Sequence, residues 1–266
     1  MKIGVVGCGG RMGRMIVSTI ATTEGCEIAG GTEPPLSPLL GQDVGAQAGL
    51  APAGLVVGDD AQALFRAADV VVDFTAPDAT ALHARLAAEM SVPLVAGTTG
   101  LTADEQKAVE DAARSVAIVQ AANMSVGINL LLGLTEETAA KFGDDYDIEI
   151  LEMHHRHKVD APSGTALALG RAAAKGRGVE LDAVAQRVRD GHTGPRRAGD
   201  IGFATMRGGD VAGEHTVVFA TEASRIEIVH RAISRAVFAG GALRAALWLD
   251  GKPPGLYSMR DVLGLG

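Results

Sequence analysis

The sequence predicts an α/β fold in which a doubly wound parallel sheet is joined to a second, α+β domain with an open, mixed and mostly antiparallel sheet. Three observations support this prediction. In residues 1–120 short apolar runs alternate with helical patterns, as in parallel sheets that helices cover on both faces. Beyond residue 126 the runs alternate apolar and polar residues instead, which is typical of strands with one wet face. A glycine-rich turn also links the first apolar run to a helical pattern.

The elements of the first domain, residues 1–125, follow from this alternation. Strands are expected at 2–7, 27–31, 55–57, 69–74, 92–97 and 116–119, and helices at 14–22, 60–68, 77–90 and 102–114. Because strands and helices take turns along the chain, the strands should be parallel.

The second domain, residues 126–234, begins with a long apolar helix at 128–142 and continues with strands expected at 146–153, 201–206, 214–221 and 225–230. A helix should begin near Ser163, where Pro162 precedes an Ala/Leu run at 166–174. The loop at 190–200 contains three glycines and is expected to be mobile. After a helix at 234–249, we expect residues 235–266 to pack back on the first domain.

Composition narrows the class of protein. A chain of 266 residues with 47% hydrophobic residues can bury a large core. Its net charge of −8 and its 3% aromatic content argue against binding to nucleic acid. The two cysteines, Cys8 and Cys26, do not form a disulfide framework, which favours a cytoplasmic location. No long apolar run or signal-peptide pattern indicates a membrane or an exported protein.

The glycine-rich turn reads Gly-Cys-Gly-Gly-Arg-Met-Gly over residues 7–13, so its third glycine comes one residue later than in G-x-G-x-x-G. Glu33 follows twenty positions later, at the end of the second expected strand. Glycines let the backbone approach a pyrophosphate, and a carboxylate can accept hydrogen bonds from ribose hydroxyls. We therefore predict a Rossmann-type dinucleotide site formed by Gly7, Cys8, Gly9, Gly10, Arg11, Met12 and Glu33. The alternative is a turn selected only for tight packing of the helix on the strand.

Glu33 also bears on the choice between NADH and NADPH. A carboxylate repels a 2′-phosphate unless a basic residue lies nearby, and the residues that follow are Pro34 and Pro35. NADH should therefore serve at least as well as NADPH, with Arg11 as the residue that could neutralise the phosphate.

Two later turns lie beyond expected strands, where doubly wound sheets bind ligands. Their backbone amides and small polar side chains suit a nicotinamide ribose and carboxamide, although ordinary loops would look similar. The residues concerned are Gly97, Thr98, Thr99, Ala121, Ala122, Asn123 and Met124.

The most informative segment is 152–165, which places three histidines, an arginine and a lysine at positions 154–158. It lies between the end of an expected strand and the start of an expected helix. The first turn of a helix has free N–H groups and the positive end of the dipole, so it attracts carboxylates and phosphates. The segment therefore predicts an anion-binding active site.

The histidines allow two other interpretations. A zinc site is not expected, because adjacent histidines on a strand point to opposite faces and no cysteine is near. A solvated basic face is the other alternative, although such faces rarely lead into a segment like Asp-Ala-Pro-Ser-Gly-Thr at 160–165. His83 and His230 are interpreted as structural, and His215 is given no catalytic role.

Taken together, the motifs resemble 4-hydroxy-tetrahydrodipicolinate reductases, also called dihydrodipicolinate reductases. The likeness extends from the first strand to the last few residues, and segment 152–165 is its most specific part. The motifs lie at 7–14, 73–75, 97–100, 121–123, 152–165, 191–194, 213–216 and 259–263.

The resemblance implies reduction of a cyclic imine dicarboxylate by NADH or NADPH in the diaminopimelate route to lysine, by a homotetramer built through the sheet of the second domain. Hydride addition at ring C4 would give an enamine, which an imidazole or ammonium group can protonate at carbon. By position, His154 would be the proton donor or acceptor and Lys158 the proton donor, and which of them protonates the carbon stays open. The substrate would be held by His155, Ser163, Gly164 and Thr165.

Two other functions remain as alternatives. One is a different two-domain NAD(P)-dependent amino-acid or semialdehyde dehydrogenase; the latter needs a catalytic cysteine in its second domain, and both cysteines here lie in the first. The other is a nucleotide-sensing module that has lost catalysis, which would have no reason to keep both His154 and Lys158.

Overall fold

The computed structural model of the chain describes residues 1–265 and divides into two units. Unit 1 comprises residues 1–126 together with the segment that starts at Arg235, and unit 2 comprises residues 127–234. Each unit has a sheet and a core of its own.

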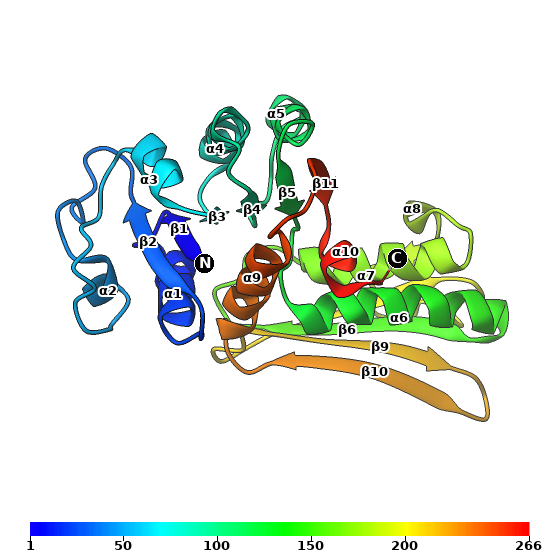
Figure 1. The fold of residues 1–266 in the computed structure, drawn as a ribbon. Coiled ribbons are helices and arrows are strands. Elements are labelled where there is room, and N and C mark those ends of the chain that lie inside the picture. The colour runs from blue at the N-terminus through cyan, green and yellow to red at the C-terminus, as the bar shows by residue number, and fades with distance from the viewer. Residues whose placement is uncertain (266) are drawn as a thin grey trace. The chain divides into compact units, whose positions relative to one another are not determined.

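Unit 1 is built on a six-stranded parallel sheet with the order β11-β5-β4-β3-β1-β2, which confirms the predicted fold class (Figure 1). Chain order reverses on the two sides of β1, so the carboxyl end of β1 lies at the point where doubly wound sheets bind their ligands. The strands are β1 (Lys2–Val6), β2 (Glu27–Thr32), β3 (Val70–Asp73), β4 (Leu94–Ala96), β5 (Ala117–Gln120) and β11 (Gly255–Tyr257).

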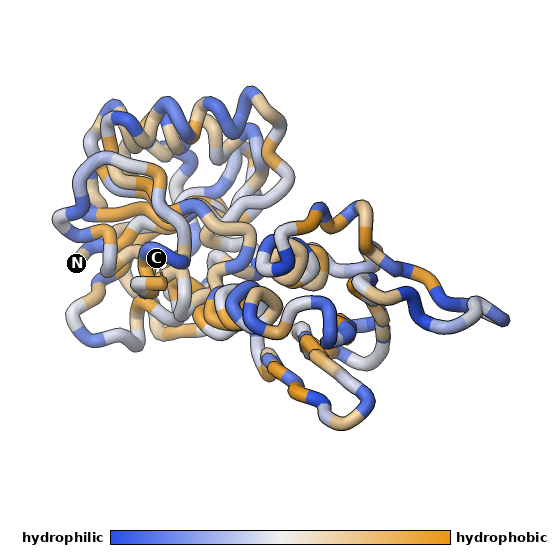
Figure 2. Tube along the Cα trace, turned by 90° about the vertical axis from the view of Figure 1, so that its right-hand side faces the viewer, coloured by the Kyte–Doolittle hydropathy of each residue, from blue (hydrophilic) through white to orange (hydrophobic). Residues whose placement is uncertain are grey.

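Helices pack on both faces of this sheet, because alternate residues of its strands point to opposite sides. On β3, Val72 joins a core cluster with α1 (Arg11–Ala21) and α9 (Ala236–Trp248). Val71 joins a second cluster with α3 (Ala61–Ala67), α4 (Pro77–Met90) and α5 (Ala103–Ala112). Two short helices, α2 (Val44–Gln47) and α10 (Met259–Leu263), complete the unit. Figure 2 shows hydrophobic and hydrophilic residues interspersed along the chain trace.

The prediction of a strand at 55–57 is wrong. Within this stretch only Val56 makes an isolated bridge, to Asp43, and Gly58, just beyond it, makes another to Thr32. The carboxylate of Asp43 accepts hydrogen bonds from the amides of Ala53 and Gly54, so the chain turns there instead of running on as a strand.

Unit 2 contains a five-stranded mixed sheet with the order β10-β9-β6-β8-β7. The β10–β9 and β9–β6 pairs are antiparallel, whereas the β6–β8 and β8–β7 pairs are parallel. The strands are β6 (Asp147–His154), β7 (Ala185–Gln186), β8 (Ile201–Arg207), β9 (Gly213–Ala220) and β10 (Arg225–Ala232). The helices are α6 (Val126–Phe142), the 3-10 helix η1 (Gly143–Asp145), α7 (Gly164–Gly176) and α8 (Leu181–Val184).

The central strand β6 has two different faces. Ile148 and Ile150 point into the core that α6 and α7 help to form, whereas Leu151 is 38% exposed on the opposite face. The same alternation buries Glu152 and His154 on the core side. Period-two geometry therefore carries two ionisable groups to the inner face at the carboxyl end of β6.

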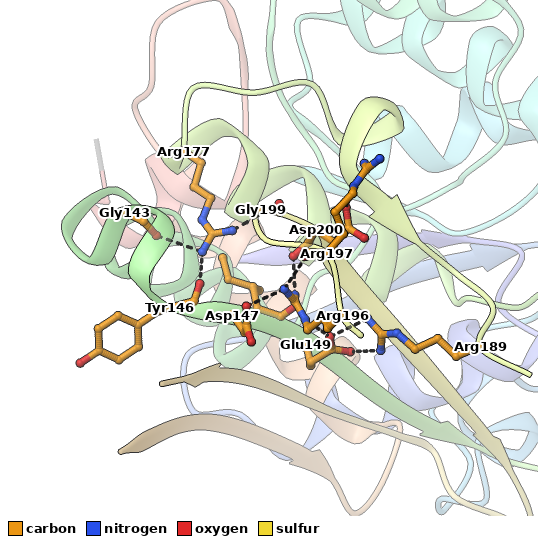
Figure 3. Close-up of polar contacts among 11 residues, drawn as sticks. Gly143, Tyr146, Asp147, Glu149, Arg177, Arg189, Arg196, Arg197, Gly199 and Asp200 are labelled. Carbon is orange, nitrogen blue, oxygen red and sulfur yellow. Dashed lines mark hydrogen bonds and ion pairs between the residues drawn. The ribbon is translucent and has the colours of Figure 1, made fainter. Parts of the chain in front are cut away.

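The outer face of β6 binds the loop that precedes β8 through a group that we call the Glu149 cluster: Asp147, Glu149, Arg189 and Arg196 (Figure 3). Arg189 donates two hydrogen bonds of 2.8 Å to the Glu149 carboxylate, and Arg196 Nε adds a third at 2.9 Å. The paired residue on β8 is Gly202. A Cβ there would overlap the Glu149 carboxylate, so glycine is what lets this carboxylate lie across β8.

Across residues 1–265, no helix combines the length and apolar character needed to cross a membrane.

Candidate active site

The glycine loop connects β1 directly to α1. Gly7 has a φ of +68°, and the N-cap residue Gly10 makes no side-chain cap. A Cβ on Gly13 would overlap the carbonyl oxygen of Gly7, so the third glycine allows the helix to pack against its own entry loop. The first turn of α1 thus presents backbone N–H groups at the carboxyl end of β1, as a pyrophosphate site requires.

Glu33 lies against this loop. The amide of Gly9 donates a 2.7 Å hydrogen bond to Oε1 of Glu33, which leaves Oε2 to accept from a ribose hydroxyl. Burial, with a further contribution from Glu33, raises the pKa of Cys8 to about 11. Cys8 therefore stays a neutral thiol near pH 7, which argues against nucleophilic chemistry at this position.

A buried polar network underlies the turn after β4. Asp73, fully buried at the end of β3, accepts hydrogen bonds from the amide and hydroxyl of Thr75 and lies 2.8 Å from His83 Nδ1. Thr98 Oγ1 accepts from Thr80 at 2.7 Å and lies 3.4 Å from Asp73. The side chain of Thr98 thus has protein partners, and its backbone is the part left to contact a ligand.

The predicted cofactor residues of unit 1 gather at one edge of its sheet. They follow β1, β2, β4 and β5, whose carboxyl ends meet there because the strands are parallel. Within this set Met124 differs from the expectation for a ligand contact, because its side chain is buried in the core with α9.

In unit 2, β6 ends in a buried carboxylate–imidazole pair. Glu152 is 1% exposed and His154 is 9% exposed, and Nδ1 of His154 lies 2.6 Å from Oε2 of Glu152. Their two-residue spacing on the strand puts both side chains on the same face.

Glu152 is also the partner of an arginine. Arg207, at the end of β8, donates hydrogen bonds of 2.8 and 2.9 Å to the two carboxylate oxygens, and the amide of Ser163 donates another at 2.9 Å. Burial raises the pKa of Glu152, but the hydrogen bonds from Arg207, His154 and Ser163 outweigh it and lower the pKa below its usual range. Glu152 is therefore ionised at neutral pH.

The sequence interpretation assigned no role to Glu152 or Arg207. The signal for Glu152 was its spacing of two from His154 on an expected strand. Arg207 gave no such signal, because its position beside His154 comes from the register of β6 and β8, in which these two residues pair.

The environment of His154 favours the neutral imidazole. Burial lowers the pKa of His154, and the charges of Lys158 and Arg207 lower it further. Glu152 opposes this shift, but the net effect is a lower pKa. A Cβ on Gly213 would lie 3.0 Å from Nε2 of His154. The second ring nitrogen therefore faces a position that has no side chain.

His215 and Ser163 lie next to this pair. The His215 ring packs edge-on against His154, with centroids 5.1 Å apart, and its Nε2 lies 3.2 Å from Ser163 Oγ. Burial, with the neighbouring His154, lowers the pKa of His215 to about 4. Ser163 Oγ also accepts from the Ala166 amide as the N-cap of α7. The Ser163 side chain, predicted to bind substrate, is thus 1% exposed and engaged with protein groups.

Lys158 lies in the loop between β6 and α7. Its Nζ is 2.7 Å from Oδ1 of Asp160, and its side chain is 21% exposed. Arg207 also donates to the carbonyl of Asp160 at 2.7 Å, so one arginine links this loop to Glu152. His155, Gly164 and Thr165 are partly or fully exposed nearby in the chain, as groups that hold a substrate must be.

Within residues 1–265 there is no group of three or more His, Cys, Asp or Glu side chains that could hold a metal ion.

Comparison with known proteins covers nearly the whole chain. Residues 1–124 match the model of the dihydrodipicolinate reductase N-terminus, and residues 127–263 match that of the C-terminus. The chain is 55% identical over 266 residues to the 4-hydroxy-tetrahydrodipicolinate reductase of Parvibaculum lavamentivorans, covering 100% of this chain and 98% of the relative. It is 51% identical over 266 residues to the enzyme of the same name from Brucella melitensis biotype 1, covering 100% and 99%.

Solved structures share the fold. A dipicolinate-bound dihydrodipicolinate reductase from Paenisporosarcina sp. TG-14 has a TM-score of 0.76 at 22% identity, with 97% of each chain covered. An Agrobacterium radiobacter oxidoreductase in complex with NAD+, L-tartaric acid and magnesium has a TM-score of 0.57 at 13% identity, covering 94% of this chain and 87% of that one.

Proposed function

The chain belongs to the dihydrodipicolinate reductase family, and we propose that it reduces 4-hydroxy-tetrahydrodipicolinate to tetrahydrodipicolinate, with NADH or NADPH as the hydride donor, in the diaminopimelate route to lysine. The observation that carries this proposal is the buried Glu152–His154 pair at the end of β6, next to the start of α7. It puts a proton-transfer group beside backbone N–H groups that can hold an anion.

The nicotinamide nucleotide, when bound, supplies the hydride. The glycine loop and the first turn of α1 would hold its pyrophosphate, and Glu33 would accept from its adenosine ribose. The turns at 97–99 and 121–124 would orient the nicotinamide end, mainly through backbone groups.

We propose that NADH serves at least as well as NADPH. Support comes from the position of Glu33 against Gly9, since a 2′-phosphate would meet this carboxylate. A kcat/KM for NADPH more than about tenfold above that for NADH would contradict it, because such a ratio means at least 1.4 kcal/mol in favour of the phosphate.

The substrate is a dianion, whereas the chain has a net charge of −8. A local group of positive side chains and backbone N–H donors must therefore hold the substrate. We assign the carboxylates to His155, Lys158 and the first-turn amides of α7 at Gly164 and Thr165. Ser163 would act through its cap on α7 and not through direct contact.

The proton steps fall to His154 and Lys158. Loss of the 4-hydroxyl as water leaves an unsaturated imine, and hydride addition at C4 moves electrons towards the ring nitrogen and gives an enamine. The enamine then takes a proton at the ring carbon between C4 and the former imine carbon. His154, through Nε2, and the Lys158 ammonium are the candidate donors, and a cationic lysine also offsets the charge that develops on the ring.

The test is a coupled assay. Substrate is generated in place by the preceding synthase, and the loss of reduced-nicotinamide absorbance is followed with NADH and with NADPH. We expect both to be oxidised, and no oxidation when the synthase is omitted. Failure to oxidise either cofactor would refute the proposal.

The exposed face of the unit 2 sheet supports a homotetramer. Leu151, Val229 and Met206 are each 38–47% exposed there, and burying such residues against other copies is favourable. Light scattering coupled to size exclusion should give four chains per particle, and a monomer would contradict this.

A further inference from the structure

Glu152 and Arg207 form an ion pair for which the proposed chemistry has so far needed no role. Arg207 contacts both oxygens of a carboxylate that is 1% exposed, and the same carboxylate reaches His154 and the start of α7. A buried ion pair of this kind contributes little to stability in itself, so its contact with His154 requires an explanation.

We propose that Glu152, clamped by Arg207, is a positioning residue that keeps the proton of neutral His154 on Nδ1 and turns Nε2 towards the glycine at 213. The expected effects on kcat rest on the proposed function. The tautomer of His154, in contrast, can be measured without any turnover.

The proton position follows from the chemistry of the acceptor. An ionised carboxylate only accepts hydrogen bonds, and Glu152 is ionised because three donors lower its pKa against the effect of burial. The 2.6 Å contact therefore requires the proton on Nδ1 of His154. In the neutral ring Nε2 then carries the lone pair, and it can take up a proton and later deliver it.

The orientation follows from the clamp. The two hydrogen bonds from Arg207 fix the plane of the carboxylate, and the Ser163 amide fixes it from the side of α7. Arg207 also holds the Asp160 carbonyl, in the loop that carries Lys158. One guanidinium thus fixes the position of the His154 ring relative to the loop that carries Lys158.

The charged and titratable groups around His154 come from three strands and one loop. Glu152 lies on β6, Lys158 on the following loop, Arg207 on β8 and the neutral His215 on β9. Glu152 is the one that favours the imidazolium, since Lys158 and Arg207 lower the pKa of His154. Loss of the Glu152 charge should therefore confine protonated His154 to lower pH.

The first test reads the tautomer in the wild-type protein and uses a variant only for assignment. In protein labelled with ¹⁵N-histidine, the His154 signals are assigned by their loss in His154→Gln, and long-range ¹H–¹⁵N couplings then report the tautomer. We expect the Nδ1–H form at pH 8 without cofactor or substrate. An Nε2–H form would overturn the proposal, whatever the activity.

The second test uses a matched pair of variants. Glu152→Gln and Glu149→Gln each remove the charge from a β6 carboxylate that Arg binds through two hydrogen bonds. We expect Glu152→Gln to lower kcat by about 10²-fold or more, as loss of a tautomer-fixing carboxylate does, and to move the high-pH limb of the kcat profile to lower pH. Glu149→Gln should keep kcat within about twofold and leave the profile in place.

Equal losses of kcat in both variants, with unshifted profiles, would mean a purely structural role and would overturn the proposal. If Glu152→Gln does not fold, Arg207→Lys replaces it, since it keeps the charge but loses the two-point clamp; wild-type kcat in that variant would count against the clamp. Wild-type turnover in His154→Gln together with an Nδ1–H tautomer would instead refute the proposed role of His154 and leave the positioning intact.

Discussion

Two arginine-bound carboxylates on opposite faces of β6 differ in what else they touch. Glu149, 31% exposed in its side chain, is shared by Arg189 and Arg196. Glu152, 1% exposed, has Arg207 on one side and His154 on the other. Arginine lowers the pKa of both against the effect of burial.

The difference lies in the second partner. At Glu149 it is another arginine, whose charge does not change at any physiological pH. At Glu152 it is an imidazole, which gains and loses a proton near neutrality. The same clamp therefore fastens a loop on one face of the strand and orients a proton carrier on the other.

The largest effect is expected when the titrating partner itself is removed. His154→Gln should lower kcat by about 10²- to 10⁴-fold, the usual contribution of general acid–base catalysis, with little change in NADH affinity. Steady-state kinetics and a fluorescence titration with NADH measure the two quantities.

The control for this variant is His157→Gln. His157 is exposed in the same loop and is assigned no contact with substrate, so its kcat should stay within about twofold. Wild-type turnover in His154→Gln would remove the basis of the comparison between the two carboxylates.

The sequence singled out His154 as a candidate but not its partners Glu152 and Arg207, and the reason is physical. Alternation along a strand identifies which residues share its face, and a histidine followed by a helix start indicates an anion site. The register between β6 and β8, which brings Arg207 to Glu152, is set by the packing of the whole sheet. For the same reason the parallel β6–β8 pairing and the Glu149 cluster could not be read from local patterns.

A smaller effect on turnover is expected at the glycine that faces His154. In Gly213→Ala the new methyl would lie 3.0 Å from Nε2, at a φ of +157°. It would crowd the side of the ring from which the proton leaves but would not touch Glu152, so kcat should fall by about 10- to 10²-fold. The ¹⁵N spectrum should still report the Nδ1–H tautomer, and an unchanged kcat would show that Nε2 acts elsewhere.

Acid should weaken the inner face of the unit 2 sheet before the outer one. The pKa of His215 is about 4 in the folded chain against 6.5 in the unfolded chain, so the unfolded state binds more protons between these values. The contribution of His215 to the free energy of unfolding is therefore complete above pH 6.5. It is lost as the pH falls towards 4, which lowers the free energy of unfolding by up to about 3 kcal/mol. His154 acts in the same direction.

Urea unfolding between pH 7 and pH 4 measures this loss. His215→Gln should flatten the dependence, whereas His157→Gln should leave it as in the wild type. A flat profile in the wild type would mean that His215 is not held neutral by burial.

The smallest effect is expected on the outer face, at Gly202. In Gly202→Ala the added methyl would overlap the Glu149 carboxylate, so the ion pairs with Arg189 and Arg196 must shift. Overpacking of this kind costs about 1–3 kcal/mol in the free energy of unfolding. Because the Glu149 cluster lies on the face of β6 opposite His154, kcat should stay at the wild-type value.

The control is Gly133→Ala, which adds the same methyl in α6 with no atom within 4 Å and should be neutral or stabilising. A loss of kcat in Gly202→Ala comparable to that in Gly213→Ala would mean that the two faces of β6 are coupled, and the division of roles between the two carboxylates would fail.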